Sequence, residues 1–296
     1  MLSVLIPVYN YDVTTLVNDL QRQCLAEGIS FTIYCLDDCS ATSFQEKNRQ
    51  LAGMEGVVYQ ELSENVGRSR IRNRLAEMAR HDYLLFMDCD SKVVRPDYIQ
   101  KYLRHLTPDT LLYGGRVYSD QPPADPALYF HWCYGTAREQ IPVDVRRKTP
   151  YHAFMTNNFL IPKATFESIG FDERLTQYGH EDTIFGLELR QRGIRLEHLD
   201  NPLEHLGLER VEVFLEKTRK GIDNLYFLWQ DNPLIDTRLL RMAQQLKSWY
   251  LAGSACWLLR RFSRVIANNL YSSQPKMLYF DLFKLLLLLE KDRESG

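Results

Sequence analysis

Residues 82–90 read DYLLFMDCD, an apolar run that ends in two carboxylates one residue apart. The run from Tyr83 to Met87 has the length and composition of a buried strand, so Asp88 and Asp90 are expected where that strand ends. Carboxylates at this spacing can bind a hard divalent cation and a nearby hydroxyl, while the cation neutralises a diphosphate. Because a plain turn also explains Asp at a strand end, the functional interpretation depends on where the fold places this pair.

The segments around this stretch predict an α/β fold with a largely parallel sheet. Over the first 120 residues, short apolar runs alternate with helical patterns, which is typical of β-α-β units. The expected strands span residues 2–8, 31–36, 57–60, 83–87, 111–118, 159–161 and 194–199. The expected helices of this part span residues 14–27, 69–80, 96–105, 163–169 and 182–192.

Polar residues follow three of these strands. The residues concerned are Tyr9, Asn10, Asp37, Asp38, Asp88 and Asp90. In an open parallel sheet the carboxyl ends of the strands meet at one edge, and helix N-termini point their positive ends toward the same edge. We therefore expect these side chains to line one ligand site.

A glycine-containing loop precedes one of the helices. Asn65-Val66-Gly67 leads into a helix that carries Arg72 and Asn73. Backbone N–H groups can approach an anion where glycine adjoins a helix N-terminus, and arginine donates to phosphate or carboxylate in a forked geometry. The other arginines of this helix fit a solvated basic face, whereas Arg72 is expected inside the protein.

A third candidate cluster is the string GHED at residues 179–182, which opens the helix over 182–192. Plain capping is one explanation, because carboxylates are stabilised in the first turn of a helix. The other is catalysis, since a reacting hydroxyl needs a carboxylate base held in place. Asp182 or Glu181 meets that requirement if Gly179 lets the loop fold over a substrate.

Composition restricts the classes of function. The chain has 296 residues, 36 basic and 38 acidic side chains and a net charge of -2, so it has no overall basic field with which to gather nucleic acid. Six scattered cysteines and the lack of a secretory signal pattern predict reduced thiols in a cytoplasmic protein. No apolar stretch is long enough for a membrane-spanning helix.

Four motifs in this order resemble the family 2 glycosyltransferases, which have the GT-A fold. They are SVLIPVYN at 3–10, LDDCS at 36–40, Asn65-Val66-Gly67 with Arg72-Asn73, and DYLLFMDCD at 82–90. GFDE at 170–173 and GHED at 179–182 extend the resemblance to about residue 210. The resemblance implies a Rossmann-like sheet flanked by helices.

The resemblance also implies a role for each matching position. The positions implied to bind a nucleotide-sugar are Pro7, Tyr9, Asp37, Asp38, Asn65, Gly67, Arg72, Asp88 and Asn158. Asp90 is implied to bind Mn²⁺ or Mg²⁺ on the diphosphate, with Asp88 and His205 as further metal ligands, and an imidazole ligand favours Mn²⁺. Asp182 is implied to deprotonate the acceptor hydroxyl, with Glu181 beside it on the acceptor or the sugar.

The expected reaction is a single displacement that inverts the anomeric centre. One base suffices for it, whereas a double displacement needs a nucleophile on the other face of the sugar. The sequence departs from the family pattern at Cys39, where a glycine is usual. It also lacks the Gln-x-x-Arg-Trp string of processive polysaccharide synthases, so we expect the addition of one sugar at a time.

Residues 211–296 are expected to form a helical extension after a catalytic domain of residues 1–210, in which 1–120 bind the nucleotide-sugar and 121–210 hold acceptor and catalytic groups. The expected helices span residues 211–230, 238–251, 255–270 and 276–291. The third is basic and amphipathic and can lie on an anionic membrane. The alternatives are a cap packed on the catalytic domain and a homodimer interface.

Together these features predict an inverting, metal-dependent glycosyltransferase. It would move a sugar from a nucleoside diphosphate carrier, with UDP-sugar as the expected donor, to a saccharide or lipid-linked saccharide in cell-surface polysaccharide assembly. One alternative is a nucleotidyltransferase that makes a sugar nucleotide, although the first loop, PVYN at residues 7–10, lacks the glycines and basic residues usual there. The other is a non-catalytic protein that binds sugar nucleotides.

Overall fold

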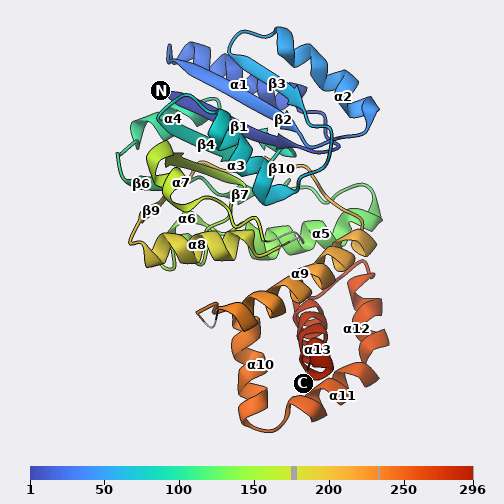
Figure 1. The fold of residues 1–296 in the computed structure, drawn as a ribbon. Helices are drawn as coiled ribbons and strands as arrows, with labels where there is room; N and C mark the ends of the chain where they lie inside the picture. The colour runs from blue at the N-terminus through green and yellow to red at the C-terminus, as the bar shows by residue number, and fades with distance from the viewer. Residues whose placement is uncertain (175–178, 233, 296) are drawn as a thin grey trace. The chain divides into compact units, whose positions relative to one another are not determined.

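The computed structural model describes residues 1–174, 179–232 and 234–295. The chain forms two compact units (Figure 1). The sheet unit comprises residues 1–119, 140–176 and 181–207, and the helical unit comprises residues 120–139, 177–180 and 208–296. The helical unit therefore includes a segment before residue 140 as well as the C-terminal residues.

The sheet unit contains a central seven-stranded sheet and a second sheet of three strands. The strands are β1 (Leu2–Val8), β2 (Phe31–Asp37), β3 (Val57–Glu61), β4 (Tyr83–Met87), β5 (Ser91–Val93), β6 (Thr110–Tyr113), β7 (Arg116–Val117), β8 (Asn158–Pro162), β9 (Arg195–His198) and β10 (Leu203–His205). The helices of this unit are α1 (Thr14–Ala26), α2 (Thr42–Asn48), α3 (Arg68–Met78), α4 (Tyr98–Arg104), α6 (Val143–Arg146), α7 (Lys163–Ile169) and α8 (Glu181–Gln191).

The central sheet has the order β3-β2-β1-β4-β8-β6-β9. All neighbouring strands are parallel except β8, which runs antiparallel to both β4 and β6. The expected fold class, a mostly parallel sheet flanked by helices, is confirmed. Strands that alternate with helices in the chain produce this arrangement because a parallel neighbour needs a crossover connection.

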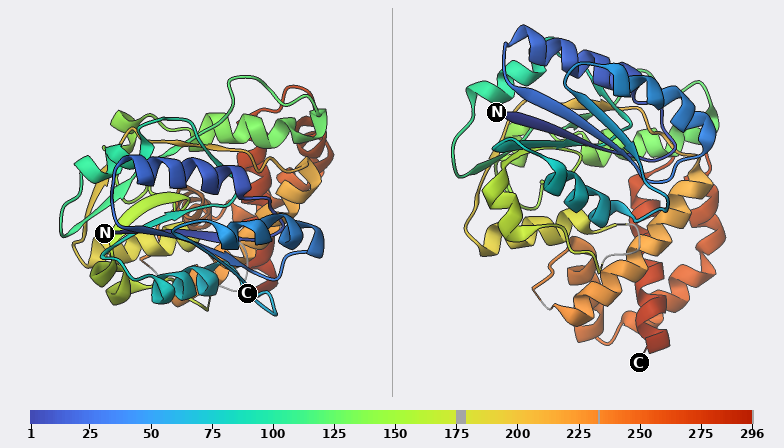
Figure 2. Two further views of the ribbon diagram at one scale, coloured as in Figure 1. Left: turned by 90° about the horizontal axis from the view of Figure 1, so that it is seen from above. Right: turned by 45° about the horizontal axis from the view of Figure 1, so that its top comes forward.

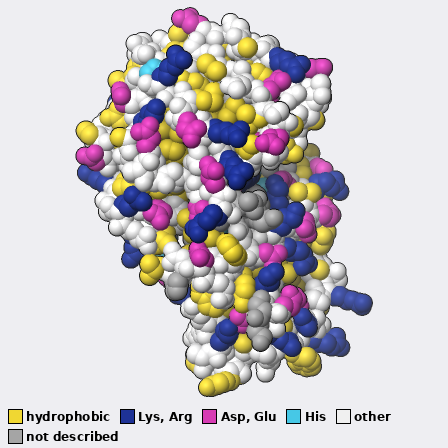
Figure 3. All heavy atoms as spheres, in the orientation of Figure 1, with side chains coloured by type: hydrophobic (Ala, Val, Ile, Leu, Met, Phe, Trp, Pro, Cys, Tyr) yellow, Lys and Arg dark blue, Asp and Glu magenta, His cyan; other side chains and the backbone are white. Residues whose placement is uncertain are grey.

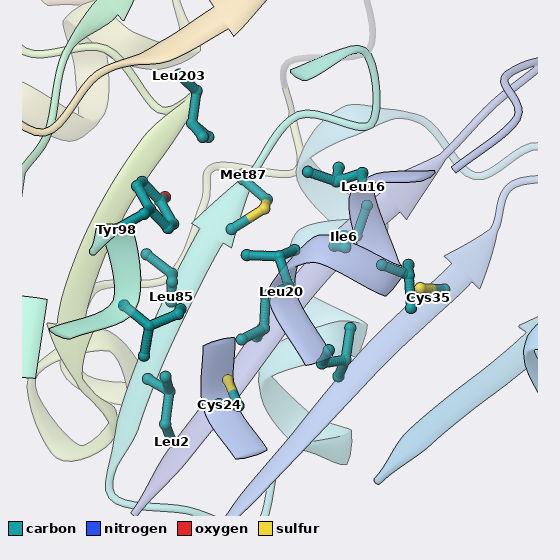
Figure 4. Close-up of a cluster of buried hydrophobic side chains, with 14 of the residues drawn as sticks. Leu2, Ile6, Leu16, Leu20, Cys24, Cys35, Leu85, Met87, Tyr98 and Leu203 are labelled. Carbon is teal, nitrogen blue, oxygen red and sulfur yellow. The ribbon is translucent and has the colours of Figure 1, made fainter. Parts of the chain in front are cut away.

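Alternate residues of β1 face two helical layers on opposite faces of the sheet (Figure 2). Val4 and Ile6 pack in one cluster with Leu20 of α1 and Tyr98 of α4 (Figure 4). Leu5, between them in the chain, packs in the other cluster with side chains of α3, α7 and α8. Each fully buried aliphatic side chain contributes about 1.5–3 kcal/mol, so β1 is fixed from both faces.

The expected strand over residues 111–118 is divided into β6 and β7, which lie in different sheets. Gly114 and Gly115 separate the two strands. Gly115 has a φ of +97°, which side chains rarely permit, and a Cβ added at Gly114 would overlap the carbonyl oxygen of Asn201. Apolar residues stand on both sides of this point, but the backbone turns at the two glycines.

Two helix boundaries also differ from the sequence-based expectation. Helix α4 begins at Tyr98 rather than Pro96, because its first backbone hydrogen bond is accepted by the carbonyl of Asp97. The helix expected over residues 255–270 is interrupted at Phe262, which has a φ of -100° and a ψ of 9°.

The first strand of the three-stranded sheet, β5, begins directly after the acids that follow β4. Its order is β5-β10-β7, with β10 antiparallel to β5 and parallel to β7. The register places His205 opposite Ser91 and Leu203 opposite Arg116. Three segments far apart in the sequence are thereby held next to Asp90.

The helical unit is built around its last helix. Its helices are α5 (Tyr129–Tyr134), α9 (Val211–Asp231), α10 (Arg238–Ser248), α11 (Ala252–Arg261), α12 (Ser263–Leu270) and α13 (Met277–Ser295). Helix α13 contacts each of α9, α10, α11 and α12, and Phe130 of α5 joins the aromatic core around Phe280. Within the described ranges, no helix combines the length and apolar character needed to cross a bilayer.

Asn158, the first residue of β8, is fully buried. Its amide oxygen accepts hydrogen bonds from the hydroxyls of Tyr98 and Tyr102, each at 2.7 Å. Its amide nitrogen donates to the carbonyl oxygens of Gly115 at 2.8 Å and Asn201 at 3.0 Å. All four hydrogen-bonding positions of the amide are used inside the protein. This corrects the expectation that Asn158 binds the nucleotide-sugar, because its side chain joins structural elements instead.

Replacing Asn158 by Leu should lower the free energy of unfolding by about 3 kcal/mol or more. The change leaves buried hydroxyls and carbonyls without partners, each at a cost of roughly 1–3 kcal/mol. Urea denaturation followed by circular dichroism measures the loss. Tyr98→Phe removes a single donor and should cost about 1 kcal/mol, so an equal loss in the two variants would contradict the role given to the amide.

Candidate active site

The candidate site lies where β1 and β4 stop pairing. The two strands are paired from Leu2 to Leu5 of β1, but β1 continues to Val8. Pro7 has no N–H with which to extend this pairing. Because the chain passes from one side of β1 to the other between β3 and β4, this is the point at which open α/β sheets bind ligands.

The loops after β1 and β2 are hydrogen-bonded to each other. The backbone N–H of Asn10 donates to Ser40 Oγ, and that of Ala41 donates to Asn10 Oδ1, both at 2.8 Å. Asp37 is fully buried and accepts from the backbone N–H of Ser40 at 2.7 Å, so it stabilises this turn from inside. Tyr9 is 53% exposed, and its ring is open to a planar ligand.

Asp38 binds the loop that precedes α3. Its two carboxylate oxygens accept from the backbone N–H groups of Val66 at 2.7 Å and Gly67 at 3.1 Å. Asn65 Nδ2 donates to the Asp38 carbonyl oxygen at 3.1 Å. Burial raises the pKa of Asp38, and the two backbone donors oppose that rise. Any contact between Asp38 and a nucleobase would therefore be additional to these bonds.

Asp88 is held by two arginines. Arg72 Nη2 donates to one carboxylate oxygen at 2.7 Å, and Arg116 Nη2 donates to the other at 3.0 Å. Arg72 is buried, as its sequence position predicts, and its guanidinium lies 5.6 Å from the ring centroid of Phe171. Because both oxygens of Asp88 are bound by cations, this arrangement disfavours Asp88 as a metal ligand.

Asp90 lies beside His205 and Gly207. Its Oδ1 is 3.4 Å from His205 Nδ1, is shielded from solvent and has no hydrogen-bond donor among the described residues. Burial opposes the ionisation of Asp90, but the combined effect of His205 and nearby arginines is larger, and the pKa of the carboxyl lies below its ordinary value. The charges of Arg116 and Arg68 act in the same direction. A Cβ added at Gly207 would overlap Asp90 Oδ2, so only glycine fits there.

This donor set fits a divalent cation that also binds substrate oxygens. In the described part of the chain, no group of three or more His, Cys, Asp or Glu residues could hold a metal ion by itself. Mg²⁺ is commonly bound by one or two carboxylates together with substrate phosphates, and a carboxylate with an imidazole suits Mn²⁺. The shielded Oδ1 of Asp90, next to His205, is the atom that such an ion would contact.

Asp182, in the first turn of α8, is bound to Thr156. Its Oδ1 accepts from the backbone N–H of Thr156 at 2.8 Å and from its hydroxyl at 2.5 Å. Burial raises the pKa of Asp182, and the neighbouring Glu181 raises it further, whereas the Thr156 hydrogen bonds lower it. The charge of Asp88 also raises the pKa of Asp182, so the two acids share one electrostatic environment. A raised pKa suits a carboxyl group that acts as a base.

The structure adds three residues that the sequence did not single out. They are Arg116 on Asp88, Gly207 against Asp90, and Thr156 on Asp182. The two glycines before Arg116 are a turn signal that could have drawn attention to it. Neither Thr156 nor Gly207 carries a sequence signal, because their importance depends on which carboxylate the fold places next to them.

Replacing Asp182 by Asn should raise the free energy of unfolding at pH 7. In the folded protein the pKa of Asp182 is above its ordinary value, so the stability that this carboxyl contributes is present below that ordinary value and is lost as pH rises through the raised pKa. Asn keeps an acceptor for Thr156 and carries no charge. Urea unfolding across the acid-to-neutral range measures the difference, which should shrink as pH falls.

Asp172→Asn is the matched control, with the opposite sign. A side-chain hydrogen bond from Arg174 lowers the pKa of Asp172, so this variant should lose stability at neutral pH and approach the wild type in acid. If Asp182→Asn were also less stable than the wild type at pH 7, the cost assigned to burying the Asp182 charge would be wrong.

Comparisons with known proteins identify the family and the fold. The family model for glycosyl transferase family 2 matches residues 3–169. No curated protein matches the sequence. The mannosyltransferase PcManGT from Pyrobaculum calidifontis, solved with GDP-Man and Mn²⁺, is similar with a TM-score of 0.60 and 12% identity, over 99% of this chain and 86% of that one. S. aureus TarS 1–349 is similar with a TM-score of 0.53 and 16% identity, over 100% of this chain and 92% of that one.

At these identities the solved structures establish the fold alone, which is the GT-A fold. The family match establishes more, because it covers over half of the chain and includes the strands and loops that carry Tyr9, Asp38, Arg72, Asp88 and Asp90. The chain therefore belongs to glycosyl transferase family 2, and it is a glycosyltransferase with a GT-A fold and a helical C-terminal extension.

Proposed function

We propose that this glycosyltransferase moves a sugar from a nucleoside diphosphate sugar, with UDP as the carrier, to a hydroxyl of a saccharide or lipid-linked saccharide in cell-surface polysaccharide assembly. The observation that carries the proposal is the pair Asp90 and His205, whose shielded carboxylate oxygen has no hydrogen-bond donor among the described residues. Two relatives in fold support a nucleotide-sugar donor, since PcManGT was solved with GDP-Man and Mn²⁺ and TarS 1–349 with UDP-GlcNAc.

The loops at the ends of β1, β2 and β4 supply the proposed donor site. The exposed ring of Tyr9 can stack on the base, next to Pro7 and the turn that Asp37 and Asp38 stabilise. The arginines on Asp88 place positive charge beside the diphosphate. Asn65 and Gly67 hold the loop that borders the same region and fix the start of α3.

Asp90 and His205 would hold Mn²⁺ or Mg²⁺. The cation supplies positive charge that neutralises the leaving diphosphate. The residues around Asp90 suit its carboxylate to bind a cation. His205 and the nearby arginines favour the ionised form, and Gly207 leaves room for the carboxylate.

Asp182 is the proposed base. Its carboxylate accepts the proton of the acceptor hydroxyl while that oxygen forms a bond to the anomeric carbon. The bond from that carbon to the diphosphate oxygen breaks, and its electron pair leaves with the nucleoside diphosphate. Thr156 orients Asp182 through two hydrogen bonds, and Glu181 stands next to it in the chain to contact acceptor or sugar. A single displacement of this kind inverts the anomeric centre.

A donor screen tests the proposed function. The protein is incubated with UDP-, GDP- and TDP-sugars, with and without Mn²⁺, and the released nucleotide is measured by chromatography. We expect Mn²⁺-dependent release of UDP from one or a few UDP-sugars. Release of pyrophosphate would favour a nucleotidyltransferase, and an absence of turnover together with tight UDP binding would favour a non-catalytic binding protein.

Asp90→Ala and Gly207→Ala should both weaken Mn²⁺-dependent UDP binding by at least about tenfold. The first removes the proposed ligand, and the second displaces it, because the added methyl overlaps Asp90 Oδ2. Calorimetric titration with and without Mn²⁺ measures the effect. Gly53→Ala adds a methyl where no atom lies within 4 Å and should bind UDP as the wild type does. Unchanged affinity in Asp90→Ala would refute the metal role.

Thr156→Val should move the acidic limb of the kcat–pH profile to higher pH. The Thr156 hydroxyl lowers the pKa of Asp182, so its removal raises that pKa further and protonates the base at a higher pH. Thr156→Ser keeps the hydroxyl and should keep the limb in place. A profile that Val leaves unchanged would show that Asp182 is not the group that must be ionised.

A further inference from the structure

Residues 237–280, here called the basic segment, have an unusual composition. The segment contains no Asp or Glu. It contains seven basic residues, which are Arg238, Arg241, Lys247, Arg260, Arg261, Arg264 and Lys276. The whole chain has a net charge of -2, so this positive charge is strictly local. The basic segment covers α10, α11 and α12 and the loops around them.

The basic segment also carries half of the large hydrophobic side chains that are exposed in the described residues. Ten such side chains lie within it, namely Met242, Trp249, Tyr250, Leu251, Trp257, Leu258, Phe262, Val265, Tyr271 and Leu278. Single exposed hydrophobics are normal on any protein, whereas a concentration of them marks an interaction surface. The lower part of Figure 3, which holds α10 and α11 in Figure 1, shows hydrophobic and basic side chains close together.

Exposed apolar and basic residues lie close together in the sequence of α11 and α12. Leu258 lies in α11, Phe262 at the interruption and Val265 in α12, and all three side chains are exposed; they are here called the stripe. Arg261 and Arg264 adjoin this stripe and are exposed. The side chains that face the interior, such as Cys256 and Ile266, lie on other positions of the helical period.

The connection between α10 and α11 projects three more large side chains. Trp249, Tyr250 and Leu251 are consecutive and all exposed, with Tyr250 at 94%. Tyr250 also has a φ of +60°, an uncommon conformation for a residue with a side chain. Trp257, one and a half turns into α11, is 67% exposed. Two of the four tryptophans of the chain are thus placed in this region.

The outward arginines carry charge that the protein does not balance. Lys247 and Arg260 form ion pairs with carboxylates of α13, at Asp292 and Glu290. Among the described residues, neither Arg261 nor Arg264 forms a salt bridge. The stripe of Leu258, Phe262 and Val265 is therefore bordered by cations that are available to an anionic partner.

We propose that the face formed by the basic segment binds the surface of a bilayer that contains anionic lipids. Tryptophan and tyrosine favour the interface between headgroups and acyl chains, and arginines attract anionic headgroups. An amphipathic helix with these two features lies in the plane of the membrane rather than across it, in agreement with the absence of a spanning helix in the described ranges.

The charge argues against a second copy of the chain as the partner. A two-fold interface brings identical patches together, so Arg261 and Arg264 of one copy, which form no salt bridge among the described residues, would meet the same cations of the other. An anionic lipid surface satisfies both the apolar and the basic side chains. Attachment of this kind would concentrate the enzyme where a lipid-linked acceptor resides, although it does not rest on the proposed donor or reaction.

Flotation with lipid vesicles tests the proposal. The full chain is mixed with vesicles of phosphatidylcholine alone or with added phosphatidylglycerol, and the bound fraction is measured at low and high salt. We expect binding that requires phosphatidylglycerol, weakens with salt and shifts tryptophan fluorescence to shorter wavelength. Arg261→Glu with Arg264→Glu should lower the affinity by more than roughly tenfold, and Trp249→Ala with Trp257→Ala should lower it at any salt concentration.

Arg80→Glu with Arg104→Glu is the matched control. Both arginines are exposed on the sheet unit, so this variant changes the net charge equally but should bind vesicles as the wild type does. Thermal unfolding confirms that all variants are folded. The proposal is overturned if anionic vesicles do not bind the wild type, if the control loses binding equally, or if sedimentation shows a dimer that the tryptophan substitutions dissociate.

Discussion

The pairing of β10 with β5 is the constraint on which the candidate site depends. β5 begins one residue after Asp90, so an antiparallel partner along it must pass next to that carboxylate. The register puts His205 opposite Ser91 and brings Gly207 against Asp90, while β7 on the other side of β10 carries Arg116 to Asp88. One three-stranded sheet therefore brings Arg116 to Asp88 and His205 to Asp90.

The four acids of the site have different partners, and these partners decide what each acid can do. Asp38 is satisfied by backbone N–H groups and Asp88 by two guanidinium groups, so both are fixed in place by the protein itself. Asp90 is ionised by its neighbours but keeps an oxygen that no donor uses. Asp182 has a raised pKa and only one acceptor oxygen bound to Thr156, which is the combination that a proton acceptor requires.

Sequence patterns predicted the parallel strands, because continuous apolar runs and polar strand ends depend on local chain properties alone. The position of Arg72 in the helical pattern after Gly67 likewise predicted its burial. The expectation of one strand over 111–118 missed its division into β6 and β7, because apolar residues stand on both sides of the two glycines that decide the turn. The role of Asn158 could not be predicted from the sequence. An asparagine at the start of a strand gives the same sequence pattern whether its amide contacts a sugar or the tyrosine hydroxyls of α4.

In the helical unit, too, the sequence predicts the local pattern of a helix but not which neighbouring helix covers it. The amphipathic pattern of residues 255–270 could be read from the chain, but a stripe of apolar residues does not reveal whether a neighbouring helix covers it. The structure separates the two cases: α11 and α12 both contact α13, whereas Leu258, Phe262 and Val265 are exposed. A helix that had served only as a cap would have its largest side chains against α13, whereas Trp257 is 67% exposed and Phe262 is also exposed. The exposure of these residues together with unbalanced arginines is what distinguishes a docking face from a structural one.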